Sequence, residues 1–458
     1  MVLKEIDLPL PPLDLLECLS GEAGLAYLEG IAGPGGRRFT VLGYAPRATL
    51  EIRAEGTVIY TSVGGVPWRA DPLAALDAFL AALPHPDDEP PFPLRDAAIG
   101  YLAYEARTAI ERVPANARDD LGLPLAMFCW YDPLLIHDDI QGRYYLASTS
   151  SQSAVEERQA LLLERLGTST SSPCIPGTGW PLATALHSNM TAQDYRAAIG
   201  RIHDYIRAGD VYQINFAQRF SARLTADPLV LFARLTRRHP MPLSAYFDAG
   251  SFQILSNTPE LFLDRQGTRI RTRPIKGTRR RGQTPEEDLR LRTELLNDPK
   301  ERAEHTMIVD LERNDLGRIC RLGTVQVRDF TQIQSFPTLH HMVSTVEGEL
   351  ESDLSVADIV RATFPGGSIT GAPKIRAMEI IDALEPNARG VYTGALGIID
   401  AAGDMHLSLA IRTAITTAGI VHYGSGGGIV ADSDADAEYA ESLLKAQAIL
   451  KALELRPE

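Results

Sequence analysis

Segments with helix and strand patterns alternate along this chain without the regular strand–helix–strand spacing that a parallel sheet requires. Helical periodicity covers residues 72–83, 154–166, 191–209 and 434–453. Residues 211–224 alternate like a strand, and Asp298 followed by Pro299 predicts a helix that continues to about Leu316. Together these patterns predict an α+β protein with large antiparallel sheets.

A stretch rich in Ser, Thr, Pro and Gly at residues 167–189 is typical of an exposed connection. We expect residues 1–166 to form an N-terminal part without an evident catalytic cluster, and residues 190–458 to carry the chemistry. At 458 residues the chain could form two or three average domains, or one large sheet structure.

The bulk composition excludes several classes of function. A formal net charge of −14 argues against nucleic acid or an anionic membrane as a partner. The four cysteines form no CxxC pair, so neither a zinc motif nor a redox motif is evident. The sequence has no signal-peptide core and no run of about 18 apolar residues. We therefore expect a soluble cytoplasmic protein.

Two glycine-rich stretches lack the residues that nucleotide-binding motifs need. Ala372 and Pro373 stand where a P-loop would have Lys and Ser or Thr, and Ile429 replaces the last glycine of GxGxxG. Each stretch is either a tight turn between sheet and helix or a run of backbone N–H groups laid against a ligand carboxylate.

Two pairs of glutamates fall three residues apart on predicted helices. Glu301 and Glu304 share one helix face, and Glu438 and Glu441 share another. Each pair alone is typical of a solvated face or of favourable charge in a first helical turn. If the pairs converge, the four carboxylates need a cation between them, and oxygen-only ligation suits Mg²⁺.

Seven Lys or Arg residues and no acid lie between Arg269 and Arg281. Among these cations, Lys276 lies between Ile275 and Gly277, next to an apolar residue rather than among other charges. A lysine that is desolvated near other cations has a lowered pKa, and its neutral amine is a nucleophile. The alternative is a solvated loop or a basic surface stripe.

Arg412, His341 and Glu260 are further candidates. Arg412 ends a run of alternating bulky and small residues, which predicts a strand with the guanidinium above small side chains. Arg412 could clamp a substrate carboxylate or pair with an acid on a neighbouring strand. His341 and Glu260 could donate or accept protons, or could be exposed or hydrogen-bonded at strand edges.

The combination of these segments resembles the family of chorismate-utilising enzymes. The resemblance implies the fold of anthranilate synthase component I, with large antiparallel sheets in an orthogonal sandwich flanked by helices. It extends from about residue 190 to the C-terminus. The matching segments, in the order of the family, are residues 210–219, 274–279, 304–318, 364–374, 391–395 and 426–433.

The resemblance also implies roles for particular residues. Mg²⁺ would be held by Glu304 and Glu441, with Glu301 and Glu438 nearby. His341 would lie near the leaving hydroxyl of chorismate, and Glu260 would be the general acid. The carboxylates of chorismate would be held by Arg412, Tyr392, Thr370 and the backbone of Gly426, Gly427 and Gly428.

Lys276 distinguishes the branches of this family. Pro-Ile-Lys-Gly-Thr resembles the aminodeoxychorismate synthases, whereas anthranilate synthases have alanine in place of the lysine. A lysine amine that bonds to C2 and expels the C4 hydroxyl directs ammonia to C4. The implied product is 4-amino-4-deoxychorismate, the precursor of 4-aminobenzoate in folate biosynthesis. Residues 211–219 lack the lysine of the water-adding isochorismate branch, so that branch is disfavoured.

Two alternatives stay open: anthranilate synthase component I, and a non-catalytic regulatory protein that binds chorismate. No cysteine lies on the glycine-flanked elbow that a glutaminase nucleophile needs. The resemblance therefore implies that ammonia comes from a separate glutamine amidotransferase subunit.

Overall fold

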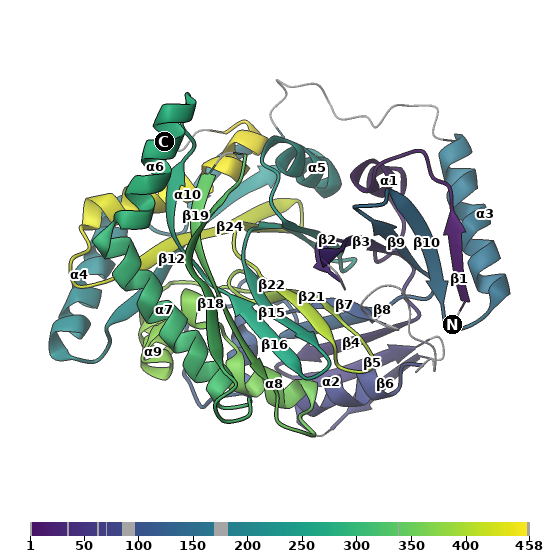
Figure 1. The fold of residues 1–458 in the computed structure, drawn as a ribbon, viewed down its shortest axis with the longest axis horizontal. Coiled ribbons are helices and arrows are strands. Elements are labelled where there is room, and N and C mark those ends of the chain that lie inside the picture. Colours follow the sequence, from purple (N-terminus) through teal and green to yellow (C-terminus); the bar gives the residue numbers. More distant parts are fainter. Residues whose placement is uncertain are drawn as a thin grey trace.

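The computed structural model describes residues 2–455 except 34–35, 62–63, 70, 85–96, 169–181 and 338. Two 12-stranded antiparallel sheets organise the described residues (Figure 1). The first sheet has the order β1 (Val2–Ile6), β10 (Arg143–Ser148), β9 (Leu134–Asp138), β3 (Arg38–Gly43), β2 (Ala26–Ala32), β13 (Leu243–Asp248), β14 (Phe252–Thr258), β23 (Thr413–Thr417), β24 (Ile420–Ile429), β12 (Gln213–Leu224) and β11 (Ala183–Ser188), with β20 (Gly371–Ala372) beside β12.

The second sheet joins strands from distant parts of the sequence. Its order is β17 (Ile275–Arg280), β19 (Leu339–Glu349), β16 (Arg269–Arg273), β15 (Leu261–Gln266), β22 (Met405–Leu409), β21 (Ala395–Ile399), β7 (Ala98–Leu102), β8 (Ala126–Trp130), β4 (Ala48–Arg53), β5 (Gly56–Thr61) and β6 (Gly64–Trp68), with β18 (Gln326–Ser335) beside β19. The predicted α+β class with large antiparallel sheets is confirmed.

Helices cover the outer faces of both sheets. One group shares an apolar cluster with the first sheet: α1 (Pro12–Cys18), α3 (Gln152–Thr168), α5 (Pro228–Arg238) and α10 (Ala435–Leu453). The others are α2 (Pro72–Ala81), α4 (Ala192–Ala208), α6 (Pro285–Asn297), α7 (Pro299–Gly317), α8 (Val356–Thr363) and α9 (Lys374–Leu384). Among the described residues, none of the helices is both long enough and apolar enough to cross a membrane.

The two sheets pack against each other through a shared core. Phe39 and Ile254 of the first sheet belong to one buried cluster with Tyr101 and Ile398 of the second. The ring of Tyr101 meets the ring of Phe247 edge-on at 6.1 Å. Because residues alternate between faces along each strand, the opposite faces remain free to pack against helices.

Local signals place the helix ends correctly. The hydroxyl of Thr191 caps α4, and Gly209 ends that helix in the left-handed conformation. The carboxylates of Asp298 and Asp434 accept backbone hydrogen bonds at the starts of α7 and α10. The predicted starts of these helices are therefore confirmed.

Three local expectations differ from the structure. Within the predicted connection, residues 169–181 lie outside the described residues, while residues 183–188 form the edge strand β11. The glycines from Gly424 to Gly428 lie inside strand β24 rather than in a turn. Arg412 is not in a strand: it lies between β22 and β23 with a φ of 50°.

Residues 2–168 and residues 182–455 contribute strands to both sheets. Strand β2 pairs with β13 in the first sheet, and β7 pairs with β21 in the second. The N-terminal and C-terminal parts of the chain are therefore interleaved within the same two sheets.

Candidate active site

Strand β24 forms the floor of the candidate site because its glycines allow side chains to approach the backbone closely. A methyl group on Gly427 would lie 3.3 Å from Glu438 Oε2 and 3.5 Å from Glu441 Oε1. Both glutamates belong to α10, which packs along β24. The absence of a side chain at Gly427 thus brings one acid pair against the strand.

Lys276 reaches the same strand from the second sheet. A methyl group on Gly428 would lie 3.2 Å from Lys276 Nζ, so the amine lies above the bare backbone of β24. Removal of water around the half-buried side chain lowers the pKa of Lys276, and the cation of Lys445 lowers it further. Both effects increase the fraction of neutral, nucleophilic amine, although Glu304 and Glu260 oppose them.

Glu260 lies just before β15 and is 5% exposed. Ser368 Oγ donates a hydrogen bond of 2.7 Å to Glu260 Oε1. Burial raises the pKa of Glu260 to about 7, even though Ser368 and Lys276 stabilise the charged form. Glu260 can therefore hold a proton near neutral pH and release it to a nearby atom.

His341 lies on β19 between Thr278 and Arg412. Its Nδ1 is 2.9 Å from Thr278 Oγ1, and its Nε2 is 3.5 Å from Arg412 Nη2. Burial lowers the pKa of His341 to about 3, and the guanidinium of Arg412 lowers it further. The imidazole is therefore neutral at physiological pH and accepts a hydrogen bond from Arg412 through Nε2.

The two acid pairs that the sequence singled out face the same region. Burial raises the pKa of Glu304, and the neighbouring carboxylates of Glu301 and Glu438 raise it further. Burial also raises the pKa of Glu438, whose Oε1 accepts a 2.7 Å hydrogen bond from Ser433 Oγ. For Glu304 and Glu438, the neighbouring lysines therefore offset the effect of burial only in part.

Other members of the acid pairs already have cationic partners. Glu301 Oε1 accepts a hydrogen bond of 3.0 Å from Arg279 Nη1, and Glu441 Oε1 lies 2.7 Å from Lys445 Nζ. Across the described residues, no three side chains of metal-ligand type are close enough to hold an ion alone. The oxygen-only donors still suit Mg²⁺ chemically, but the ion would need further oxygen ligands from a bound substrate or water.

Lys445 is a site residue that the sequence analysis missed. Its Nζ donates a hydrogen bond of 2.9 Å to the carbonyl of Gly426 in addition to pairing with Glu441. The available signal was its position four residues after Glu441 on a predicted helix, which favours an ion pair.

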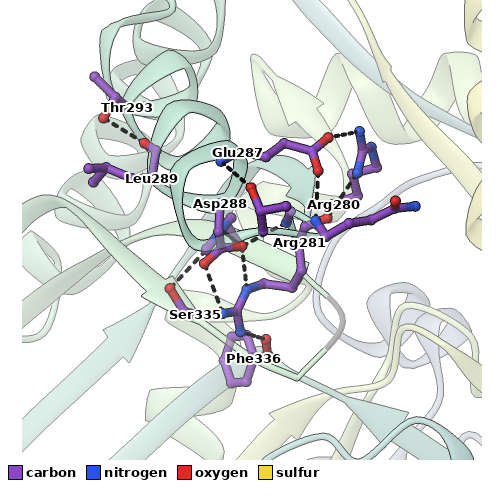
Figure 2. Close-up of polar contacts among 12 residues, drawn as sticks. Arg280, Arg281, Glu287, Asp288, Leu289, Thr293, Ser335 and Phe336 are labelled. Atoms are coloured by element: carbon purple, nitrogen blue, oxygen red, sulfur yellow. Dashed lines mark hydrogen bonds and ion pairs between the residues drawn. The ribbon is translucent and has the colours of Figure 1, made fainter.

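Most of the basic residues between Arg269 and Arg281 form ion pairs with acidic side chains of neighbouring elements. Figure 2 shows Arg280 paired with Glu287, and Arg281 with Asp288 of α6. Arg281 Nη1 also donates a hydrogen bond of 2.7 Å to the carbonyl of Phe336. The other ion pairs of these basic residues are Arg269 with Glu347, Arg271 with Asp264, and Arg279 with Asp298 and Glu301. The arginines therefore fix β17, and with it Lys276, rather than forming an open anion site.

Thr370 and Tyr392 lie in buried surroundings near β24. Thr370 Oγ1 donates a hydrogen bond of 3.0 Å to the carbonyl of Gly366. The ring of Tyr392 packs against Gly424, where a methyl group would lie only 2.4 Å from the ring. Tyr392 also lines a cavity together with Glu385 and Arg389.

Comparison with known proteins shows which family the chain matches. Residues 30–451 match the family described as chorismate binding enzyme. The chain is 40% identical to aminodeoxychorismate synthase component 1 of Salmonella typhimurium, over 91% of this chain and 90% of the relative. It is 37% identical to anthranilate synthase component 1 of Thermus thermophilus, over 95% of this chain and 94% of the relative.

A solved structure has the same fold. The crystal structure of anthranilate synthase component I from Streptococcus pneumoniae matches with a TM-score of 0.81 and 33% sequence identity. The match covers 90% of this chain and 92% of that structure. The expected fold of anthranilate synthase component I is therefore confirmed.

Proposed function

The chain belongs to the family of chorismate binding enzymes, and within this family of chorismate-utilising enzymes we propose that it makes 4-amino-4-deoxychorismate from chorismate and ammonia. The observation that carries this proposal is Lys276, whose amine lies over Gly428 with a lowered pKa. Such an amine can act as a covalent nucleophile, which decides where nitrogen enters the ring.

Substrate binding would use both carboxylates of chorismate. The guanidinium of Arg412 would supply a cation for one carboxylate, and the buried hydroxyl groups of Tyr392 and Thr370 would add polar contacts. The backbone N–H groups of Gly426, Gly427 and Gly428 can approach the substrate because they carry no side chains.

Glu304 and Glu441 are the residues that would hold Mg²⁺, with Glu301 and Glu438 adding negative charge around them. Burial raises the pKa of Glu304, whereas Lys445 lowers the pKa of Glu441. A divalent cation whose remaining ligands are oxygen atoms would favour the charged form of both carboxylates. A bound Mg²⁺ would neutralise a substrate carboxylate and polarise the ring attached to it.

In the first half of the reaction, the neutral Lys276 Nζ attacks C2 of chorismate. The N–C2 bond forms, the two ring double bonds shift, and the C4–O bond breaks. Glu260 protonates the departing C4 hydroxyl, which leaves as water, and its carboxylate then takes the surplus proton from Nζ. The neutral His341 can hydrogen-bond near the leaving hydroxyl without adding charge.

In the second half, ammonia forms a bond to C4 while the double bonds shift back and the N–C2 bond breaks. The surplus proton passes from the new C4 ammonium to the lysine amine, so Lys276 and Glu260 return to their starting forms. The enolpyruvyl group stays attached throughout, which distinguishes the product from anthranilate.

Ammonia would come from a separate glutamine amidotransferase subunit in the cytoplasm. Several relatives are named component 1 of a synthase, which supports a two-component enzyme. Free ammonium should replace the partner in vitro.

The identity of the product tests the proposal. The purified protein is incubated with chorismate, Mg²⁺ and ammonium, and the products are separated by chromatography. We expect 4-amino-4-deoxychorismate, and prompt formation of fluorescent anthranilate would instead establish the activity that the name of the 37% identical relative states. A lack of any chorismate turnover, even with a cognate glutaminase, would favour a regulatory binding protein.

A further inference from the structure

Gln213 is a fully buried polar residue in the candidate site that has no assigned role. It is 0% exposed, and neither Nε2 nor Oε1 of its side chain has a hydrogen-bond partner among the described residues. Buried amides are normally hydrogen-bonded, because an unpaired polar group in a dry site is destabilising. An exception therefore indicates a group that acquires its partner from a ligand or from a rearranged neighbour.

The backbone holds Gln213 firmly at the start of β12. Gln213 pairs with Ala372 of β20, and the next residue, Ile214, pairs with Ile429 at the end of β24. Gly371 lies so close that a methyl group on it would be 2.2 Å from the carbonyl of Gln213. The backbone of Gln213 is thus held by the pairing of β12 with β20 and β24.

The amide of Gln213 and the amine of Lys276 lie over the same backbone position. A methyl group on Gly428 would be 2.9 Å from Gln213 Nε2 and 3.2 Å from Lys276 Nζ. Gln213 comes from the first sheet and Lys276 from the second, so side chains from both sheets approach the backbone of Gly428.

We propose that Gln213 is a positioning residue, whose side-chain amide holds the neutral Lys276 amine in the orientation for attack on chorismate. The neutral amine has two N–H donors and one lone pair. The atom of Gln213 nearest to this position is Nε2, and no hydrogen bond of the side chain opposes a half-turn of the amide that brings Oε1 to the amine. Accepting one N–H at Oε1 restricts rotation about the last bond of the lysine and directs the lone pair at the substrate. The inference rests on the nucleophilic role of Lys276 proposed above.

Gln213→Met tests this role because methionine has a similar length and no polar amide. The rate of the covalent adduct with chorismate and Mg²⁺, in the absence of ammonia, is followed by rapid quenching and intact-protein mass spectrometry. We expect the adduct to form about 10- to 100-fold more slowly, as misoriented reactants do. The KM for chorismate should stay within about threefold, and the melting temperature should not fall, because an unpaired buried amide is removed.

Gln218→Met is the matched control on the same strand. Gln218 is also buried, but it accepts a 2.8 Å hydrogen bond from Ser188 and donates one of 2.7 Å to Ser442. This control should lower the melting temperature because it leaves two partners unpaired, and it should leave the adduct rate unchanged.

The outcomes separate this inference from the proposed function. Adduct formation at the wild-type rate in Gln213→Met would overturn the positioning role while leaving Lys276 as the nucleophile. A slower rate accompanied by an equal rise in KM or a lower melting temperature would also overturn it, because a structural role gives that result. If the wild-type protein forms no adduct, the proposed function itself fails.

Discussion

Glu260 and Lys276 have opposite pKa shifts within one site. Burial raises the pKa of Glu260 to about 7 and lowers the pKa of Lys276, so desolvation favours the neutral form of both groups. A neutral acid and a neutral amine are the two species that the proposed first half-reaction needs. The same buried environment would therefore prepare both the proposed proton donor and the proposed nucleophile.

The pH dependence of the reaction follows from these two shifts. The rate should rise with pH as Lys276 loses its proton, and should fall on the alkaline side with a midpoint near the pKa of about 7 for Glu260. Glu260→Gln should reduce kcat by about 10²- to 10⁴-fold and should remove the alkaline limb. Profiles of kcat for the two proteins check this, and an unchanged alkaline limb in the variant would exclude Glu260 as the acid.

Gly428→Ala should disturb the nucleophile directly. The added methyl group would lie 3.2 Å from Lys276 Nζ and 2.9 Å from Gln213 Nε2, so at least one side chain must move. We expect kcat to fall by about 10- to 100-fold, because small displacements of reacting groups have effects of this size. Gly200→Ala on α4, where a methyl group meets only open space, is the control and should keep wild-type kcat.

At the scale of elements, α7 anchors the loop that positions the hydrogen-bond donor to Glu260. The buried carboxylate of Glu312 accepts a 3.1 Å hydrogen bond from the backbone N–H of Gly367, next to Ser368. Lys374 Nζ donates a 2.5 Å hydrogen bond to Asp315 and so joins the far end of this loop to the same helix. The acid and its donor are thus held by one helix and one loop.

The buried Glu312 should make stability depend on pH. Burial raises the pKa of Glu312 well above its ordinary value, and the neighbouring carboxyl group of Asp315 raises it further. Because the folded-state pKa lies above the ordinary value, the stabilisation is complete below about pH 4.5 and is lost as pH rises through the folded-state pKa. We expect Glu312→Gln to reduce this loss and to be more stable than the wild type at pH 8.5.

Urea unfolding at pH 5.5 and pH 8.5 measures this effect. The wild-type protein should lose more free energy of unfolding between the two pH values than Glu312→Gln does. Equal losses in both proteins would show that Glu312 keeps its charge in the folded state.

Elements with local determinants were predictable from the sequence, and those with remote determinants were not. Thr191, Asp298 and Asp434 mark helix starts because a cap bonds to its own backbone. Gly424–Gly428 suggested a turn by composition, yet these residues form a strand because β12 pairs with them from more than 200 residues away. The alternation of bulky and small residues before Arg412 predicted a strand there. Instead, Arg412 lies where the chain passes from β22 of the second sheet to β23 of the first.

At the scale of the whole molecule, the site depends on contacts between the sheets. Lys276 of β17 meets Gly428 of β24, and no local pattern reports such a contact. The acid pairs were visible as helical spacing, but their approach to one another was not. Gln213 was missed as a site residue because its significance lies in its neighbours, and the spacing of Lys445 from Glu441 predicts an ion pair but not the contact with Gly426.

Binding of Mg²⁺ and chorismate should be mutually dependent. Since no three metal-ligand side chains are assembled among the described residues, Mg²⁺ alone should bind weakly. Chorismate supplies carboxylate oxygens, so each ligand should raise the affinity for the other by the same factor. Glu304→Gln should abolish this coupling and reduce kcat by at least about 10²-fold.

Titration calorimetry with Mg²⁺, in the presence and absence of chorismate, checks the coupling. Equal Mg²⁺ affinity in both experiments would contradict a shared site. Chelation of Mg²⁺ should also abolish turnover, with recovery on adding the ion back.

The central claim is that the Lys276 amine bonds to the substrate, and its most direct test is the mass of the intact protein. The protein is mixed with chorismate and Mg²⁺ without ammonia, quenched and analysed beside Lys276→Ala. The wild type should gain the mass of one chorismate less one water, and Lys276→Ala should gain nothing. An unmodified wild-type protein that nevertheless converts chorismate once ammonium is added would contradict the claim.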